Sequence, residues 1–230
     1  DSFPDNSDAK VGKGLVYYQE GKLEDAKELI SDVLAEYPDN NNALLELSWC
    51  KIQLHELEEG REGLLKGFEN IKGSDLRSFD RRSTVLWRLA QSYIFEAESV
   101  EDENVITDLV QKSYDYLLRS LKTNKNNAAS YTSLGLIYKN YYDDENRALK
   151  CFYKAFDLDV GEIVSASFLV EDFVAKSDWE LAEVLCERLV SSEKVRRMLP
   201  KENVDKSWPY RVLGVAALET QKGEKAVEWF

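Results

Sequence analysis

The chain has few of the residues on which catalytic and metal sites are usually built. Its 230 residues include one histidine, His55, and three cysteines, Cys50, Cys151 and Cys186. The cysteines are far apart and form no CxxC pair, which argues against a disulfide framework and against a zinc site. We therefore expect three free, buried thiols, and we expect His55 to be a solvated turn residue without a metal or catalytic partner.

Long hydrophobic runs and nucleotide-binding motifs are missing as well. No stretch approaches the roughly 18 apolar residues that a membrane-spanning helix needs. The start, Asp1–Asp5, has neither the basic flank nor the apolar segment of a signal peptide. No GxxxxGK[ST], GxGxxG or HExxH motif occurs. These absences predict a soluble protein that is no enzyme, holds no metal or cofactor and does not enter a membrane.

Positive charge is also scarce, with 30 lysines and arginines against 43 aspartates and glutamates, a net charge of −13. A surface of this sign repels phosphate, so we expect no direct nucleic-acid binding by this segment. The acidic stretch that includes Glu96, Glu101 and Glu103 lacks the residue order and the turn glycine of a calcium loop. We interpret it as a solvated loop.

What the sequence does contain is an internal repeat. The tripeptide Pro-Asp-Asn stands at residues 4–6 and again, 34 residues later, at 38–40. In one register along the chain, small residues recur at repeat positions 8 and 20, as Gly14, Gly135 and Ala148 illustrate. Small side chains at these positions let two antiparallel helices approach closely, while larger side chains between them fill the remaining space.

This pattern resembles the tetratricopeptide-repeat (TPR) family, whose period is about 34 residues. It predicts an all-α solenoid, a right-handed superhelix of stacked helix-turn-helix repeats. About six repeats are expected, the last of them truncated, at 7–40, 41–74, 83–127, 128–162, 163–196 and 207–230. Insertions at 75–82 and around 96–106 interrupt the period. Because polar capping repeats are missing at both ends, we expect a single array that is an excerpt of a longer one.

In TPR proteins the first helix of each repeat lines a concave groove, and here the corresponding positions are mostly apolar or aromatic. The lysine and asparagine with which some TPR co-chaperones clamp a carboxylate are replaced, so that function is disfavoured. Exposed apolar rows mark interfaces, yet a tightly wound superhelix would bury the same residues, and the sequence leaves both readings open. The candidate partner-binding residues are Val11, Leu15, Tyr18, Leu45, Trp49, Ile52, Trp87, Ile94, Phe95, Leu136, Lys139 and Arg211.

Several longer motifs go beyond the general TPR pattern. They are Leu47-Ser48-Trp49 and the segments 76–80, 147–159 and 208–214, the last beginning Trp-Pro-Tyr. Together they look like the TPR scaffold subunit of the fungal superkiller complex. That resemblance implies a cytoplasmic, non-catalytic scaffold. Its partners would be a DExH-type RNA helicase, WD40 propeller subunits and the cytoplasmic exosome or its adaptor, in a complex that delivers mRNA for 3′-to-5′ decay.

Two other functions remain open at this point. The chain could be a free-standing peptide-binding adaptor that uses the apolar groove, or the targeting array of a larger enzyme. The scaffold and the adaptor differ in whether the groove is occupied within a native complex. The targeting array would require a catalytic domain elsewhere in the same protein.

Overall fold

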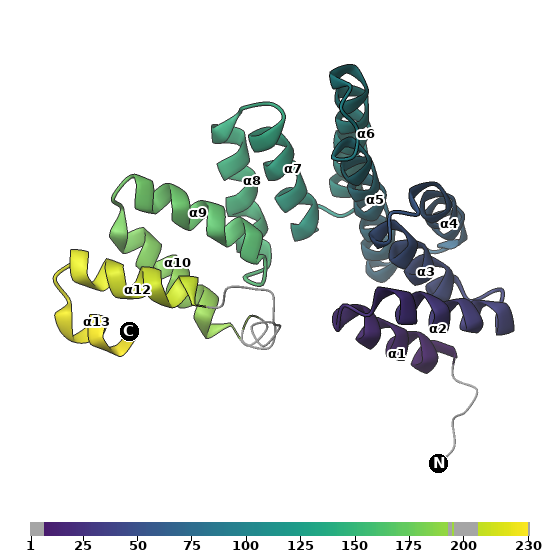
Figure 1. Ribbon diagram of the computed structural model, residues 1–230, viewed down its shortest axis with the longest axis horizontal. Helices are drawn as coiled ribbons and strands as arrows, with labels where there is room; N and C mark the ends of the chain where they lie inside the picture. The colour runs from purple at the N-terminus through teal and green to yellow at the C-terminus, as the bar shows by residue number, and fades with distance from the viewer. Residues whose placement is uncertain (1–6, 193–194, 196–206, 230) are drawn as a thin grey trace, which may run out of the picture. The chain divides into compact units, whose positions relative to one another are not determined.

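The computed structural model describes residues 7–192, 195 and 207–229, and every regular element in that part of the chain is an α-helix (Figure 1). Most of the helices form antiparallel pairs joined by short turns, and the predicted all-α class is confirmed. The helices are α1 Ser7–Gln19, α2 Leu23–Glu36, α3 Asn41–Gln53, α4 Leu57–Asn70, α5 Leu76–Ala97, α6 Glu103–Thr123, α7 Ala128–Asn140, α8 Glu145–Leu158, α9 Ile163–Ala175, α10 Trp179–Ser191, α12 Trp208–Glu219 and α13 Gly223–Trp229.

The chain divides into two compact units, Asp1–Lys125 and Asn126–Phe230. Helices α1 to α6 belong to the first unit, and helices α7 to α13 belong to the second. Successive helices contact one another within each unit, as expected for a repeat protein in which each pair packs on its neighbour. The single array across both units stays a prediction.

Paired helices come close where the sequence predicts small residues. A Cβ atom added to Gly14 on α1 would lie 2.5 Å from the Ile30 side chain on α2. A Cβ atom on Gly135 of α7 would lie 2.4 Å from the ring of Phe152 on α8. No side chain larger than hydrogen fits at these contacts without displacing its neighbour. The close helix approach inferred from these glycines is therefore confirmed.

The core of the first unit consists of two clusters that share helix α3. Leu47 and Cys50 of α3 pack with buried residues of α1 and α2. Leu45, Trp49 and Ile52, also on α3, pack with buried residues of α4 and α5. Because α3 buries side chains on both sides, the first two helix pairs and α5 are stabilised as one body rather than as separate pairs.

Helices α5 and α6 are longer than the repeat pattern predicts, at 22 and 21 residues. The residues interpreted as insertions, 75–82 and 96–106, mostly extend these two helices, and only residues 98–102 connect them. The interpretation of the acidic stretch as a loop is corrected accordingly, because Glu96 lies on α5 and Glu103 begins α6.

The helix extensions have local causes. Asp75 caps α5 by accepting the Ser78 N–H at 3.0 Å, and Asp102 caps α6 by accepting the Asn104 N–H at 2.9 Å. Between the two helices, the fully buried hydroxyl groups of Ser83 and Ser120 lie 2.8 Å apart. These small polar side chains allow close contact and satisfy each other's hydrogen-bonding capacity in the interior.

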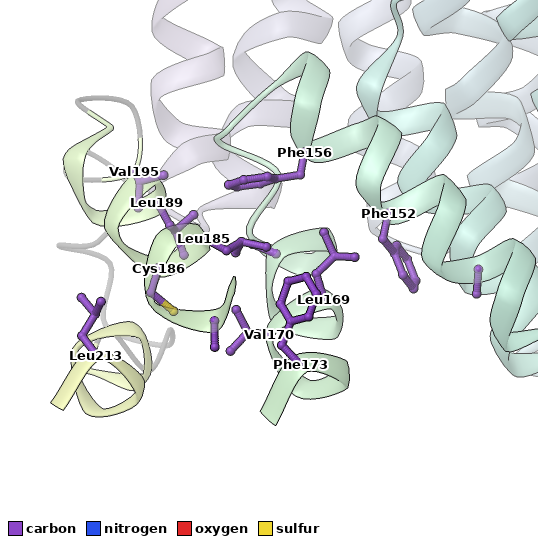
Figure 2. Packing of buried hydrophobic residues seen from close by; sticks show 13 residues of the cluster. Phe152, Phe156, Leu169, Val170, Phe173, Leu185, Cys186, Leu189, Val195 and Leu213 are labelled. Carbon is purple, nitrogen blue, oxygen red and sulfur yellow. The ribbon is translucent and has the colours of Figure 1, made fainter. Parts of the chain in front are cut away.

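The core of the second unit is one cluster drawn mainly from α8, α9, α10 and α12 (Figure 2). Phe152 of α8 is 1% exposed and stacks on Phe168 of α9 with ring centroids 4.8 Å apart. Glu183 of α10 is also buried and accepts a hydrogen bond from Lys222 Nζ at 2.6 Å. This hydrogen bond lowers the pKa of Glu183, which keeps the carboxylate ionised and ties α10 to the turn after α12.

The contact between Gly135 and Phe152 yields a stability test. Gly135→Ala should lower the free energy of unfolding by about 1–3 kcal/mol, because the stacked, buried Phe152 ring cannot move aside cheaply. The matched control is Gly12→Ala on α1, where no atom outside the local helix backbone lies within 4 Å of the added Cβ. That change should stabilise by up to about 1 kcal/mol through helix propensity alone. Urea denaturation measures both, and equal effects would contradict the packing described here.

Candidate interaction surface

Helices α1, α3 and α5 of the first unit carry most of the predicted groove residues. Helix α3 contacts both α1 and α5, so these three first helices of successive pairs lie side by side. Leu136 and Lys139 on α7, and Arg211 on α12, belong to the second unit. The predicted residues on α1, α3 and α5 of the first unit are therefore treated as one continuous surface.

Tyr18, Trp49 and Trp87 form an aromatic row across α1, α3 and α5. The indole Nε1 of Trp49 donates a hydrogen bond to the Tyr18 hydroxyl at 3.1 Å. The Trp49 and Trp87 rings have centroids 5.5 Å apart and are inclined by 45°. Burial raises the pKa of Tyr18, so its hydroxyl stays protonated and can hydrogen-bond at any physiological pH. The row is thus fixed by a hydrogen bond at one end and a ring contact at the other.

An ion pair between α3 and α5 holds this row in place. The Nη1 and Nη2 atoms of Arg88 donate to the two carboxylate oxygens of Glu46 at 3.1 and 2.8 Å. Both side chains are nearly buried, 13% and 14% exposed. The Arg88 guanidinium also lies 5.3 Å from the centre of the Trp49 ring. A bidentate pair of this kind fixes geometry as well as adding energy, so it sets the separation of α3 and α5.

Ile94 and Phe95 continue the surface toward the end of α5. Both side chains are half-buried, and the Phe95 ring lies 6.1 Å from the His55 ring. His55 is exposed in the turn between α3 and α4 with a φ of 62°, so its prediction as a solvated turn residue is confirmed. Its contact with Phe95 is a feature that the sequence does not reveal.

The structure buries several of the residues that the sequence assigns to a groove. Val11, Leu45 and Ile52 are at most 4% exposed, and Trp49 is 7% exposed. They belong to the core clusters because the adjoining helix pair packs over them. For these four, the interpretation as groove lining is corrected to core. The residues that offer surface are Leu15, Tyr18, Trp87, Ile94 and Phe95, all half-buried. Partner binding at these residues stays a prediction.

The predicted residues of the second unit are engaged within that unit. Leu136 packs at the edge of its core cluster. The Lys139 ammonium lies 5.1 Å from the centre of the Phe168 ring and 3.5 Å from a carboxylate oxygen of Glu145. Arg211 is exposed on α12 and donates to the Ser207 hydroxyl. A role for these residues in partner binding also stays a prediction.

Sequence reasoning misses the polar side chains that brace this surface. Arg61 of α4 donates to the carbonyl of Ser92 at 2.8 Å and pairs with the carboxylate of Glu96, both on α5. Its guanidinium also lies 4.2 Å from the centre of the Tyr93 ring. These partners are 31 to 35 residues apart in sequence. This separation is close to one repeat period, but the repeat pattern specifies only small and apolar positions, so it does not identify which polar side chains pair.

Other kinds of site receive no support from the described part of the chain. There, no group of three or more His, Cys, Asp or Glu side chains could hold a metal ion. Among the described helices, none is both long and apolar enough to cross a bilayer.

The three cysteines lie in environments that disfavour the thiolate form. Cys50 and Cys186 are buried, as predicted, whereas Cys151 is half-buried. Burial raises the pKa of Cys50 and Cys151 to about 11 and that of Cys186 to about 12. All three thiols are therefore protonated at neutral pH, which removes the nucleophilic thiolate.

The Glu46–Arg88 pair yields a second stability test. Arg88→Met should lower the free energy of unfolding by about 2–3 kcal/mol, because it leaves the Glu46 carboxylate nearly buried without its partner. The double variant Glu46→Met/Arg88→Met removes both charges and should lie within about 1 kcal/mol of the unmodified protein. Urea denaturation of the single and double variants measures the difference. Equal losses in both would show that the pair does not hold α3 and α5 together.

The family model described as tetratricopeptide repeat matches residues 17–70. Superkiller protein 3 of Saccharomyces cerevisiae is 37% identical over 225 residues, which cover 98% of this chain and 15% of that protein. Superkiller protein 3 of Schizosaccharomyces pombe is 32% identical over 228 residues, 99% of this chain and 15% of that protein. Superkiller complex protein 3 of Homo sapiens is 24% identical over 172 residues, 75% of this chain and 10% of that protein. The chain thus spans a small part of these relatives.

Two solved structures share the fold at low sequence identity. A thermophilic TPR protein of Thermus thermophilus has a TM-score of 0.66 at 17% identity, with 92% of this chain and 99% of that chain covered. PilF of Pseudomonas aeruginosa has a TM-score of 0.59 at 16% identity, with 97% and 88% covered. Together with the helix pairs and the small residues at their contacts, these comparisons show that the chain belongs to the tetratricopeptide-repeat family and is homologous, over nearly all of its length, to a segment of superkiller protein 3.

Proposed function

We propose that this chain is a non-catalytic scaffold segment of a superkiller-type complex. Such a complex would contain a DExH-type RNA helicase and WD40 propeller subunits, and would deliver mRNA to the cytoplasmic exosome, or to its adaptor, for 3′-to-5′ decay. The observation that carries the proposal is the 37% identity to superkiller protein 3 over 98% of the chain. The structural neighbours, at 16–17% identity, share only the fold.

The chemistry of the first unit suits a scaffold that binds proteins. Tyr18, Trp87, Ile94 and Phe95 present partly exposed apolar and aromatic surface on neighbouring first helices. Aromatic residues of this kind carry much of the energy of protein interfaces. The Glu46–Arg88 pair and the Tyr18–Trp49 hydrogen bond hold the row before any partner arrives. A preformed surface loses little conformational entropy on binding, which favours affinity.

The net negative charge of the chain suits a subunit that binds proteins while other subunits of the complex bind RNA. The chain carries a net charge of −13, and a surface of this sign repels the phosphates of RNA. Cys50 and Cys186 are buried, and burial raises the pKa of all three cysteine thiols, which disfavours the thiolate form. RNA binding and ATP hydrolysis would therefore belong to other subunits, and this segment would contribute contacts between proteins.

A free-standing peptide-binding adaptor is the second candidate function. It is favoured by the partial exposure of Trp87 and Phe95, which presents aromatic surface that an apolar peptide side chain can contact. The two functions differ in the proteins that the surface would retain, so one experiment separates them.

The test is affinity purification of the protein, in its natural full length, from fungal extract. We expect recovery of an RNA helicase, a WD40 protein and exosome components. Trp87→Ala/Phe95→Ala should reduce recovery of at least one of them by about tenfold or more, as expected for loss of interface anchors. The matched control is Leu65→Ala/Leu118→Ala, which removes side chains that are 44% and 45% exposed on α4 and α6. The control should recover the same proteins as the unmodified chain.

The outcomes separate the candidates. Recovery of unrelated clients without a helicase would contradict the superkiller assignment and support the adaptor. If both double variants recover the helicase, the WD40 protein and the exosome components, the superkiller assignment stands. The aromatic surface is then not the docking site for these proteins. Circular dichroism of each variant checks that the helices remain folded.

A further inference from the structure

An open polar pocket lies at one end of the first unit, away from the aromatic row. Its volume is about 580 Å³, and it is formed where α3 and α5 begin and α4 ends. It is lined by Asn41, Asn70, Ile71, Lys72, Asp75, Arg77, Ser78 and Arg81. None of the predicted groove residues lines it, so it is a separate feature of the surface.

Three cationic side chains line this pocket, and their protein contacts are few. The Arg77 guanidinium group has no hydrogen bond or ion pair to any described residue, and the Arg81 guanidinium group donates only to the side-chain oxygen of Asn42, at 3.3 Å. The Lys72 ammonium donates to a backbone carbonyl, that of Glu69, at 3.0 Å. Arg77 and Arg81 lie one helical turn apart on α5, so both guanidinium groups lie on the same side of that helix.

The one carboxylate in the lining is already committed. Asp75 accepts the backbone N–H of Ser78 at 3.0 Å and the Ser78 hydroxyl at 2.8 Å. These hydrogen bonds lower the pKa of Asp75, which keeps the carboxylate ionised as the cap of α5. The two guanidinium groups therefore stay available, and the pocket is locally cationic in a chain whose net charge is −13.

The surroundings decide which anion fits. A second pocket of about 610 Å³ adjoins the first, shares Asn41 and Arg81 with it, and is lined by the acidic residues Asp8, Glu36 and Asp39. A nucleic-acid backbone, with a charge on every nucleotide, would meet these carboxylates and be repelled. A short acidic segment needs to reach only Arg77 and Arg81, one helical turn apart on α5, although Arg81 also lines the second pocket. Leu76 lies in sequence between the lining residues Asp75 and Arg77 without itself lining the pocket, and its side chain is 88% exposed and can contact an apolar residue.

We propose that this pocket binds an acidic peptide segment of a partner protein, with carboxylates on Arg77 and Arg81 and one apolar side chain against Leu76. The guanidinium group is planar and offers paired donors, which match a carboxylate in bidentate fashion. The inference goes beyond the scaffold function proposed above and does not depend on which complex the chain joins.

The test measures fluorescence anisotropy with the natural full-length protein. The probes are a panel of fluorescein-labelled short peptides rich in aspartate and glutamate around one leucine or phenylalanine. Matched peptides with lysine in place of the acids, and a labelled oligouridylate, serve as comparison probes. We expect binding of one or more acidic peptides, weakened by added salt, and no comparable binding of the lysine peptides or the RNA.

Variants then locate the binding site. Arg77→Glu/Arg81→Glu should raise the Kd of the acidic peptide by about tenfold or more. Arg77→Gln/Arg81→Gln should raise this Kd by a smaller factor. The matched control is Lys112→Glu/Lys150→Glu, which changes the net charge equally at exposed sites outside both pockets. The Kd of the control variant for the acidic peptide should stay within about twofold of that of the unmodified protein, apart from the general effect of net charge. Circular dichroism confirms folding.

Three results would overturn the inference. The first is that no acidic peptide in the panel binds. The second is that the control variant weakens binding as much as the arginine variants do, which would reduce the effect to net charge. The third is that oligouridylate binds with the same dependence on Arg77 and Arg81, which would make the pocket a nucleic-acid site instead.

Discussion

The close approach of paired helices at small residues is the constraint on which the rest of this structure depends. At Gly14 and Gly135 a single added carbon would overlap the side chain of the partner helix. Only this spacing lets Ile30 and Phe152 reach fully buried positions between their helices. A helix pair on its own still leaves an apolar face uncovered, so each pair needs a neighbour. Helix α3 shows the result, because it contributes to the core clusters on both of its sides.

The fold was predictable because its determinants are periodic and local. The recurrence of Gly14, Gly135 and Ala148 in one register is enough to infer helix pairs, and the helices follow it closely. The long helices α5 and α6 escaped prediction because an insertion in the repeat can become a loop or an extension of a helix. Their caps, Asp75 and Asp102, are common polar residues that mark a helix start only when the fold is known.

The sequence predicts which helix carries each candidate surface residue, but it does not predict how exposed that residue is. An apolar residue on a first helix can face the concave side or the next helix pair, and hydrophobicity is the same in both cases. The structure places Val11, Leu45 and Ile52 in the core and leaves Trp87 and Phe95 partly exposed. The polar braces Glu46–Arg88 and Arg61–Ser92 depend on contacts between residues more than thirty positions apart. The repeat pattern specifies small and apolar positions and does not identify which polar side chains pair.

The first unit therefore combines two surfaces of different chemistry on one rigid frame. The aromatic row crosses the first helices, and the cationic pocket opens at the junction of α3, α4 and α5. Both surfaces lie on helix ends or helix faces whose geometry is fixed by buried contacts, which suits a protein that positions others. If the pocket binds as we propose, a local cationic site in a net-acidic chain would favour a short acidic peptide over nucleic acid.

Hydroxyl-radical footprinting tests the central claim most directly, namely that the surface of α1, α3 and α5 is where a partner protein binds. Side-chain oxidation would be compared between the isolated protein and its native assembly, by mass spectrometry. We expect Tyr18, Trp87 and Phe95 to be oxidised in the isolated protein and protected in the assembly, while the exposed references Leu65 and Leu118 change little. Unchanged oxidation of the three aromatic residues, with protection elsewhere on the chain, would contradict it.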